Sequence, residues 1–376
     1  MNESIDTELK HILQESFGHA QFRLNQLDII KNILQGDDTL GILPTGGGKS
    51  VCYQIPALYL EGITIVISPL ISLMQDQVTN LAQNGIRACF INSTLTPEER
   101  ADIENDIISG EVKIVYLSPE GLLAGGLTHF FSQLEISLIA IDEAHCVSQW
   151  GHEFRQDYTR LGVLKERFPA TPILALTATA DSKTRDDIIF QLKQNNPKVF
   201  ISSFDRPNIN YTICEKENEL QQLNSFIKEK HSKHTGIIYC LSRKKVEKIS
   251  QDLNELGYKT RPYHAGLPQE VRTKTQQAFN TEDGIIIVAT IAFGMGIDRP
   301  DVRFVAHLDL PKSIESYYQE TGRAGRDGDP SDVWMAYGLG DIIKLSQMLE
   351  TTQASEEYKK VARRKLDSML GLLSLI

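Results

Sequence analysis

The chain has 376 residues, of which 41% are hydrophobic and 23% are charged. This length allows two or three domains with cores of their own, and the composition excludes a chain that is disordered throughout. No apolar run approaches the roughly 20 residues that a membrane-spanning helix needs. The formal net charge of −10 counts against nucleic acid as a partner, although a local basic groove can coexist with an acidic exterior.

The cysteines and the first residues indicate the compartment. Met1–Asp6 lacks the basic region and apolar core of a secretory signal. The five cysteines lie far apart, without a C-x-x-C pair, at positions Cys52, Cys89, Cys146, Cys214 and Cys240. This spacing excludes a cysteine-rich zinc site, so zinc is not expected within this chain, and it favours free thiols in a reducing cytoplasm.

Short apolar runs alternate with helical stretches over most of the chain. Continuous apolar runs separated by helices are typical of parallel strands buried on both faces. The predicted strands of the first half are Thr39–Leu43, Ile63–Pro69, Lys113–Pro119, Leu138–Glu143 and Ile173–Thr179. Those of the second half are Gly236–Cys240, Gly284–Thr290 and Val302–Asp309. Between the halves, the turn-rich stretch Ser202–Asn208 is the predicted linker. Functional residues are expected just past the carboxyl ends of the strands.

A glycine-rich loop follows the first predicted strand. Its glycines allow backbone N–H groups to approach phosphate oxygens, Lys49 supplies a positive charge, and Ser50 offers a hydroxyl to Mg²⁺. The strict G-x-x-x-x-G-K-[ST] pattern departs at its first position, which is Leu43. The alternative is a turn that happens to precede a lysine, but the strand, loop and helix context favours a nucleotide site. Its predicted residues are Thr45, Gly46, Gly47, Gly48, Lys49 and Ser50.

An acidic pair follows the predicted strand Leu138–Glu143. Asp142 suits Mg²⁺ coordination beside a phosphate loop, and Glu143 is placed to orient the attacking water. Alone, an Asp-Glu pair at a strand end is equally well a solvated surface feature. Together with the phosphate loop, it predicts a site that hydrolyses a nucleoside triphosphate.

The segment Cys146–Tyr158 places aromatic and polar residues in a short span. Trp150, Phe154 and Arg155 lie within it, and aromatic side chains interleaved with arginine form a stacking platform for single-stranded bases. The alternative is an ordinary core loop. The polar residues between the aromatic ones favour the binding function.

These motifs, in their order and spacing, resemble the RecQ-type DNA helicases of helicase superfamily 2, from about Phe17 to Gly328. The resemblance rests on the phosphate loop, on the D-E-A-H run with the aromatic-rich loop after it, and on further matching segments. These segments are Phe17–Arg23, Ser68–Leu70, Ser118–Glu120, Thr177–Thr179, Tyr239–Arg243, Tyr263–Gly266, Ala289–Asp298 and Gln319–Arg326. Gly121 departs from the pattern because a basic residue is common there. The zinc-binding and winged-helix modules of the family are absent from this chain.

The resemblance implies two RecA-like parallel-sheet domains, at residues 1–204 and 205–340, with an ATP cleft between them. It also implies a helical extension at residues 341–376 that begins a zinc-binding module. The apolar cluster at its end is Met369, Leu370, Leu372, Leu373, Leu375 and Ile376. We therefore expect a motor core of a longer protein; the alternative is that this cluster packs back on the second domain and completes it.

The resemblance also assigns residues to roles. His19, Arg23 and Gln26 are expected to hold adenine, and Asp298 to face the nucleotide. Arg326 is expected to be the arginine finger, with Arg323 and Gln319 beside it. The residues expected to bind DNA, or to couple its binding to hydrolysis, are His145, Gln149, Trp150, His152, Phe154, Arg155, Ser68, Thr177, Ser242, Arg243, His264 and Thr290.

The predicted function is an ATP-dependent 3′-to-5′ DNA helicase that acts in DNA repair and recombination, with ATP and Mg²⁺ as cofactors. The expected partners are single-stranded and partly duplex DNA, with a single-strand-binding protein as a candidate, and we expect a monomer without membrane contact. The expected location is the cytoplasm, in association with the nucleoid if the source is a bacterium, or the nucleus if it is a eukaryote.

Three alternatives remain open. An RNA helicase of the wider DEAH-type superfamily would be stimulated by RNA, although the Trp150 loop favours DNA. A nucleic-acid-binding scaffold would carry a defective ATP site, against which Lys49, Asp142, Glu143 and Arg326 all speak. A P-loop kinase or transporter ATPase would ignore DNA and would not need the second predicted sheet.

Overall fold

The computed structural model describes residues 2–92, 95–123, 126–151, 154–294, 297, 299–352 and 355–373. The chain divides into two compact units, Met1–Phe204 and Asp205–Ile376. Within the described residues, no helix combines the length and the apolar character that crossing a membrane requires.

The first unit is built on a seven-stranded parallel sheet with the strand order β3-β4-β2-β5-β6-β1-β7. Its strands are β1 (Thr39–Ile42), β2 (Ile63–Ile67), β3 (Ala88–Ile91), β4 (Ile114–Leu117), β5 (Ile136–Ile141), β6 (Ile173–Thr177) and β7 (Lys198–Ile201). Residues of β2 alternate between two cores: Ile65 packs into one, and Val66 into the other. Both faces of this strand are therefore buried, which explains its continuous apolar sequence.

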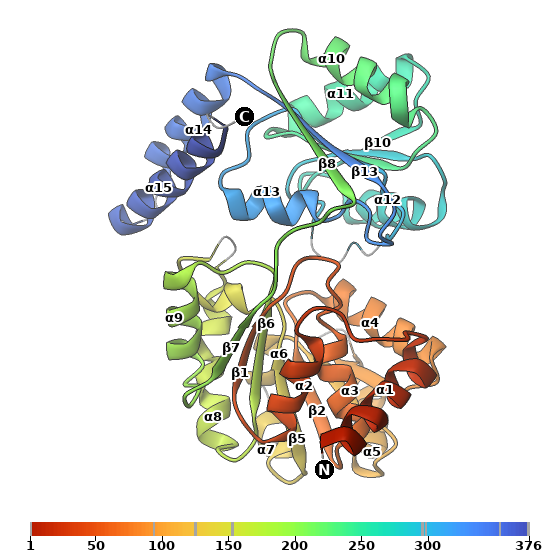
Figure 1. Ribbon diagram of the computed structural model, residues 1–376, viewed down its shortest axis with the longest axis vertical. Helices are drawn as coiled ribbons and strands as arrows, with labels where there is room; N and C mark the ends of the chain where they lie inside the picture. The colour runs from red at the N-terminus through yellow and green to blue at the C-terminus, as the bar shows by residue number, and fades with distance from the viewer. Residues whose placement is uncertain are drawn as a thin grey trace. The chain divides into compact units, whose positions relative to one another are not determined.

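Helices connect the strands of the first unit (Figure 1). They are α1 (Asn2–Phe17), α2 (Gln26–Leu34), α3 (Val51–Tyr59), α4 (Ile71–Gln83), α5 (Pro97–Ile108), α6 (Pro119–Leu123), α7 (Leu127–Phe131), α8 (Val163–Arg167) and α9 (Ser182–Gln191). Two short 3₁₀ helices, η1 (Ala144–Val147) and η2 (Gln156–Gly162), follow β5. The carboxyl ends of β1, β5 and β6 lie side by side, because these strands pair in register.

The second unit has a six-stranded parallel sheet with the order β10-β11-β9-β12-β13-β8. Its strands are β8 (Ile209–Glu215), β9 (Gly236–Tyr239), β10 (Thr260–Tyr263), β11 (Ile286–Ala289), β12 (Phe304–His307) and β13 (Ser331–Tyr337). The two faces of this sheet again feed separate cores, since Ile237 packs into one and Ile238 into the other.

The helical elements of the second unit are α10 (Glu219–Phe226), the single-turn π-helix η3 (Ile227–His231), α11 (Arg243–Glu255), α12 (Gln269–Thr281), α13 (Ile314–Thr321), α14 (Leu339–Thr351) and α15 (Glu356–Leu373). Helices α14 and α15 lie side by side (Figure 1). Leu366, Met369 and Leu373 of α15 pack into one core of the second unit. These three side chains therefore belong to the core of the second unit; residues 374–376 lie outside the described residues.

Five strands were not predicted from the sequence: β3, β7, β8, β10 and β13. The first four are the edge strands of the two sheets. Pro262 lies in β10, where an edge position tolerates a residue that cannot donate a ladder hydrogen bond. The predicted strands that the structure does contain are mostly shorter than predicted, because the last residues of each apolar run belong to the loops.

Candidate nucleotide and nucleic-acid sites

The glycine-rich loop joins β1 to α3 in the first unit. Gly46 and Gly48 adopt left-handed backbone conformations, with φ angles of 77° and 71°. A Cβ atom on Gly48 would lie 2.5 Å from Nε2 of Gln26, so a side chain there would displace the Gln26 amide as well as strain the left-handed backbone. Lys49 and Ser50 follow at the start of α3 and are half-buried. The loop therefore has the backbone form and the helix N-terminus that phosphate binding requires.

Gln26 anchors this loop from the start of α2. Its amide nitrogen donates to the carbonyl oxygens of Gly47 (3.1 Å) and Gly48 (2.9 Å), and its Oε1 accepts from the backbone N–H of Arg23 (2.8 Å). To recognise adenine, the Gln26 amide would have to give up these hydrogen bonds and form new ones to the base. His19 and the side chain of Arg23 are exposed.

The acidic pair lies at the carboxyl end of β5. Burial raises the pKa of the Asp142 carboxyl to about 7; the nearby Glu143 carboxylate adds to the rise, and Lys49 opposes it. Glu143 has a φ angle of 49°, a left-handed conformation that is uncommon for a residue with a side chain. Strained backbone of this kind persists where the surrounding structure holds it, and such positions cluster at functional sites.

His145 connects the acidic pair to the end of β6. Its side chain is fully buried, with Nδ1 3.3 Å from Oε2 of Glu143 and 3.0 Å from Oγ1 of Thr177. The hydroxyl of Thr177 also accepts from the backbone N–H of Thr179 (3.3 Å). His145 therefore lies between the Glu143 carboxylate, which is expected to orient water, and Thr177 at the end of β6.

The aromatic-rich loop is held by α9. The backbone N–H of Trp150 donates to Oγ of Ser148 (3.1 Å), and that hydroxyl donates to Oδ2 of Asp187 on α9 (2.6 Å). Nζ of Lys183, one helical turn earlier, lies 3.4 Å from the centroid of the Trp150 ring. A cation over an indole face is attracted by the ring quadrupole. Sequence reasoning missed Lys183 and Asp187, because only the fold brings α9 against this loop.

Other predicted residues of this loop differ in exposure. Gln149 is exposed, and 45% of Phe154 is accessible to solvent. Arg155 donates to the carbonyl oxygen of Pro69 (2.8 Å), which ties the loop to the Ser68–Leu70 motif. Ser68 itself is buried, and its hydroxyl has no hydrogen-bond partner among the described residues. His152 lies outside the described residues.

The two candidate arginines of the second unit differ in their surroundings. Arg323 is 5% exposed and donates from Nη1 to the carbonyl oxygen of Gly294. Arg326 and Gln319 are half-buried. The structure therefore places Arg323 inside the unit and leaves Arg326 the more accessible of the pair. Asp298 lies outside the described residues.

The remaining predicted DNA-contacting residues of this unit surround α11 and β11. Ser242 caps α11 by accepting from the backbone N–H of Lys245 (3.3 Å), and Arg243 is exposed. His264 is buried, with Nε2 3.1 Å from Oε1 of Glu247. Thr290 is half-buried and follows β11. These residues lie at the carboxyl ends of the parallel strands β9, β10 and β11.

The two units carry recognisable domain families. Residues 23–188 match the DEAD/DEAH box helicase family, and residues 215–328 match the helicase conserved C-terminal domain. The chain is 51% identical to ATP-dependent DNA helicase RecQ of Pasteurella multocida over 338 residues, which cover 90% of this chain and 53% of that protein. It is 49% identical to the RecQ of Haemophilus influenzae, over 93% of this chain and 57% of that protein.

The chain belongs to the RecQ family. It spans about half the length of the curated RecQ relatives that it matches. The part that it covers is the motor core, in which both units are RecA-like domains. A solved structure of the Mycobacterium smegmatis helicase Lhr bound to ssDNA and AMP-PNP shares this fold, with a TM-score of 0.67 and 20% identity over 89% of this chain and 48% of that one.

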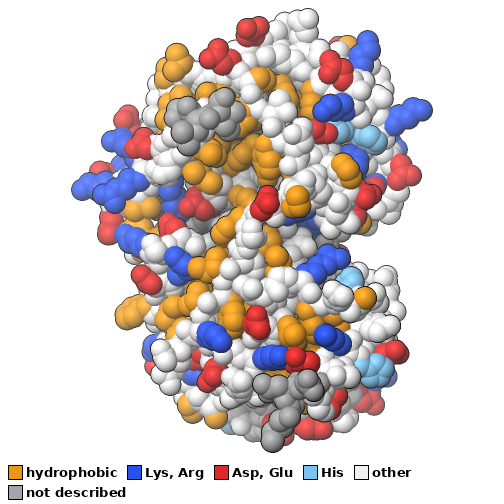
Figure 2. Space-filling view, viewed as in Figure 1, with side chains coloured by type: hydrophobic (Ala, Val, Ile, Leu, Met, Phe, Trp, Pro, Cys, Tyr) orange, Lys and Arg blue, Asp and Glu red, His pale blue; other side chains and the backbone are white. Residues whose placement is uncertain are grey.

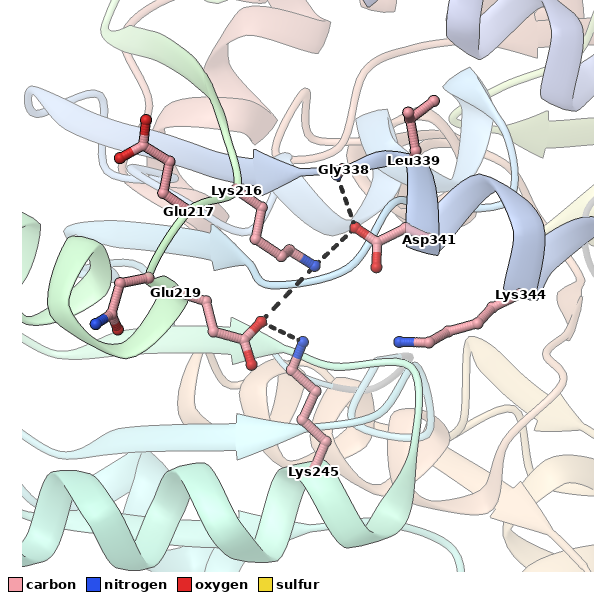
Figure 3. A pocket seen from close by; sticks show the side chains of 10 residues that line it. Lys216, Glu217, Glu219, Lys245, Gly338, Leu339, Asp341 and Lys344 are labelled. Carbon is pink, nitrogen blue, oxygen red and sulfur yellow. Dashed lines mark hydrogen bonds and ion pairs between the residues drawn. The ribbon is translucent and has the colours of Figure 1, made fainter.

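A further pocket of the RecQ motor lies in the second unit, at the carboxyl ends of β8 and β13. Lys216 and Lys245 point toward Glu219 and Asp341 within it, and Lys344 extends toward the same space (Figure 3). Nζ of Lys216 lies 2.7 Å from Asp341 Oδ2, and Nζ of Lys245 lies 2.7 Å from Glu219 Oε2. Because the lysines near the centre are already paired with carboxylates, the pocket holds an internal ion-pair network.

The charges on the surface of the RecQ motor are mixed. On the face shown in Figure 2, Lys and Arg side chains lie among Asp and Glu side chains and do not form one continuous basic stripe. On this face, therefore, no single run of basic side chains offsets the net charge of −10.

Proposed function

We propose that this chain is an ATP-dependent 3′-to-5′ DNA helicase motor that couples ATP hydrolysis to movement along single-stranded DNA and to duplex unwinding in repair and recombination. One observation supports this proposal above the others. His145 contacts both Glu143 and Thr177, and the aromatic-rich loop begins at the next residue. The direction of movement rests on membership of the RecQ family.

The phosphate loop holds the triphosphate, and the acidic pair serves the metal ion and the attacking water. Lys49 neutralises phosphate charge and Glu143 orients the attacking water, since hydrolysis needs positioning and charge neutralisation more than covalent chemistry. Ser50 and Asp142 offer the hard oxygen ligands that suit Mg²⁺. Burial and the neighbouring Glu143 carboxylate raise the pKa of Asp142, and a cation bound there would favour its charged form. When bound, Mg²⁺ would neutralise the phosphate oxygens.

Arg326 is the proposed arginine finger. It is half-buried and more accessible than Arg323, and we propose that its guanidinium stabilises the charge that develops on the γ-phosphate during hydrolysis. Arg323 supports it from inside the unit, and Gln319 and Asp298 complete the nucleotide-facing set. His19 and Arg23 remain the proposed adenine contacts, together with Gln26.

DNA is the proposed track. Trp150 and Phe154 are proposed to stack on bases, and Arg155, Ser242 and Arg243 to contact the sugar-phosphate backbone of the DNA. Binding is therefore expected to depend little on the DNA sequence. Ser68, Thr177, His264 and Thr290 belong to the same proposed set. We further propose a monomer that works beside a single-strand-binding protein, in the cytoplasm of a bacterium or the nucleus of a eukaryote.

The deciding experiment measures ATP turnover with no nucleic acid, with single-stranded DNA and with single-stranded RNA. We expect turnover to rise with DNA and to change little with RNA. Stimulation by RNA alone would favour an RNA helicase, and turnover that ignores both would favour a P-loop ATPase of another class. Strand separation on duplexes with a 3′ or a 5′ single-stranded tail then tests the polarity.

A further inference from the structure

The segment that opens the second unit contacts the turn that carries the two arginines. Arg206 donates from Nη1 to the carbonyl oxygen of Gly322 (3.3 Å) and from Nη2 to those of Ala324 (3.0 Å) and Gly325 (2.8 Å). These three carbonyls flank Arg323 and precede Arg326 directly. One guanidinium therefore spans the whole Gly322–Gly325 turn.

Asn208 holds the same turn from the next position but one. Its amide nitrogen donates to the carbonyl oxygens of Gly325 (2.9 Å) and Asp329 (3.0 Å). Gly325 has a φ angle of 54°, and a Cβ atom there would lie 2.6 Å from the amide nitrogen of Asn208. The turn is thus closely packed against the segment that contains Arg206 and Asn208, and these contacts restrict its shape.

The location explains why an arginine suits this position. The turn follows α13, and the last carbonyls of a helix lack partners within it. A cation at a helix C-terminus is also favoured by the helix dipole. The planar fork of arginine presents several N–H groups at fixed angles, which a lysine cannot do. Capping of α13 alone would account for the contact with Gly322, but it does not account for the contacts with Ala324 and Gly325.

We propose that Arg206 is a positioning residue for the arginine finger and acts through Arg326. This inference rests on the proposed function. Because backbone carbonyls accept its hydrogen bonds, Arg206 sets the path of the chain into Arg326 and with it the place of that guanidinium. Asn208 supports the same turn. Neither residue needs to touch the nucleotide for its loss to slow hydrolysis.

The test is a double-mutant cycle on single-turnover hydrolysis of radiolabelled ATP at saturating single-stranded DNA. We expect Arg206→Gln to lower the rate constant by about 100-fold, the typical cost of a small misplacement of a catalytic group. The Kd for a non-hydrolysable ATP analogue should stay within about 3-fold, because the phosphate loop, the acidic pair and the proposed adenine contacts all lie in the first unit and are unchanged. Arg206→Lys should restore only part of the rate.

The cycle separates positioning from a purely structural role. In a protein that already carries Arg326→Ala, adding Arg206→Gln should lower the rate constant by less than a further factor of about 2. The reason is that the effects of residues that act as a unit are non-additive. The inference would be overturned if the rate losses of the two single substitutions multiply in the double mutant, or if Arg206→Gln keeps the wild-type rate. The matched control is Asn210→Ala in β8, the strand that follows Arg206 and Asn208. It removes a bond to Asp332 (3.0 Å) but none to the turn, and it should keep the wild-type rate.

Two further arms keep the outcome decisive. Should Arg206→Gln fail to fold by circular dichroism, Asn208→Ala replaces it in the same cycle, because it removes two bonds from the same region. Wild-type protein that shows no DNA-stimulated hydrolysis would overturn the proposed function itself, and this inference with it. If the wild-type protein shows DNA-stimulated hydrolysis but the two substitutions act independently, only this inference is overturned and the proposed function stands.

Discussion

The two units share a parallel-sheet architecture but hold their candidate catalytic groups in different ways. In the first unit, functional side chains contact each other directly, as Glu143, His145 and Thr177 do. In the second unit, the turn that carries Arg323 and Arg326 is held by hydrogen bonds to its backbone carbonyls. A substitution in the first unit therefore removes a group and disturbs its neighbours at once. In the second unit, a displaced turn moves an arginine that is itself unchanged.

The largest expected effect comes from Lys49→Ala in the first unit. Turnover should fall to background while the protein stays folded, because no other lysine lies in the phosphate loop. ATP turnover and circular dichroism check this prediction, with the exposed Lys193→Ala as the control. Near-wild-type turnover in a folded Lys49→Ala protein would remove the phosphate-site assignment.

The second prediction separates the two arginines. Arg326→Ala should slow hydrolysis by about 10³-fold or more without lowering the thermal midpoint, as expected for an arginine finger. Arg323→Ala should lower the midpoint as well, because it leaves the buried carbonyl oxygen of Gly294 without that donor. Single-turnover rates and thermal unfolding of both variants test this. Equal stability of the two variants would contradict the distinction.

The third prediction concerns Trp150. Trp150→Ala should weaken DNA binding by about 1–3 kcal/mol, the usual worth of one stacked base, and should abolish most of the DNA stimulation of ATP turnover. Trp334→Phe is the matched control, since Trp334 is buried in the second unit and stacks on Phe226. Early melting of Trp150→Ala with stimulation intact would instead make Trp150 a core residue.

The smallest expected effect is a pH dependence of stability in the second unit. Burial lowers the pKa of His231 from 6.5 to about 4; Asp332 opposes this shift and His234 adds to it. Between these pKa values the unfolded chain binds a proton that the folded chain does not. The stabilising contribution is therefore complete above about pH 6.5 and is lost as the pH falls toward 4.

Thermal unfolding at pH 7 and pH 5 measures this effect. His231→Phe should flatten the difference, because a phenyl ring fits beside Phe226 and Phe304 and does not titrate. His11→Ala, at an exposed position of the first unit, should leave the difference unchanged. An unchanged difference in His231→Phe would assign the pH dependence to other groups.

Several features of the protein could be predicted from the sequence because they depend on local order along the chain. Apart from β13, which was not predicted, the interior strands are buried and mostly apolar and so appear as nearly continuous runs; they are β1, β2, β4, β5, β6, β9, β11 and β12. The phosphate loop and the D-E-A-H run are contiguous, so their chemistry is visible without a fold. By contrast, β10, with Arg261 and Pro262, is half-exposed at a sheet edge and leaves no such run.

Only the tertiary structure decided which residues support the site. Lys183 lies 33 positions after Trp150, and Arg206 lies 116 positions before Gly322, so no local pattern links either pair. The contact between Gln26 and the phosphate loop likewise depends on how α2 packs beside α3. Motifs are set by the chemistry of neighbouring residues along the chain. Their supports are set by burial and backbone geometry, which exist only once distant segments meet.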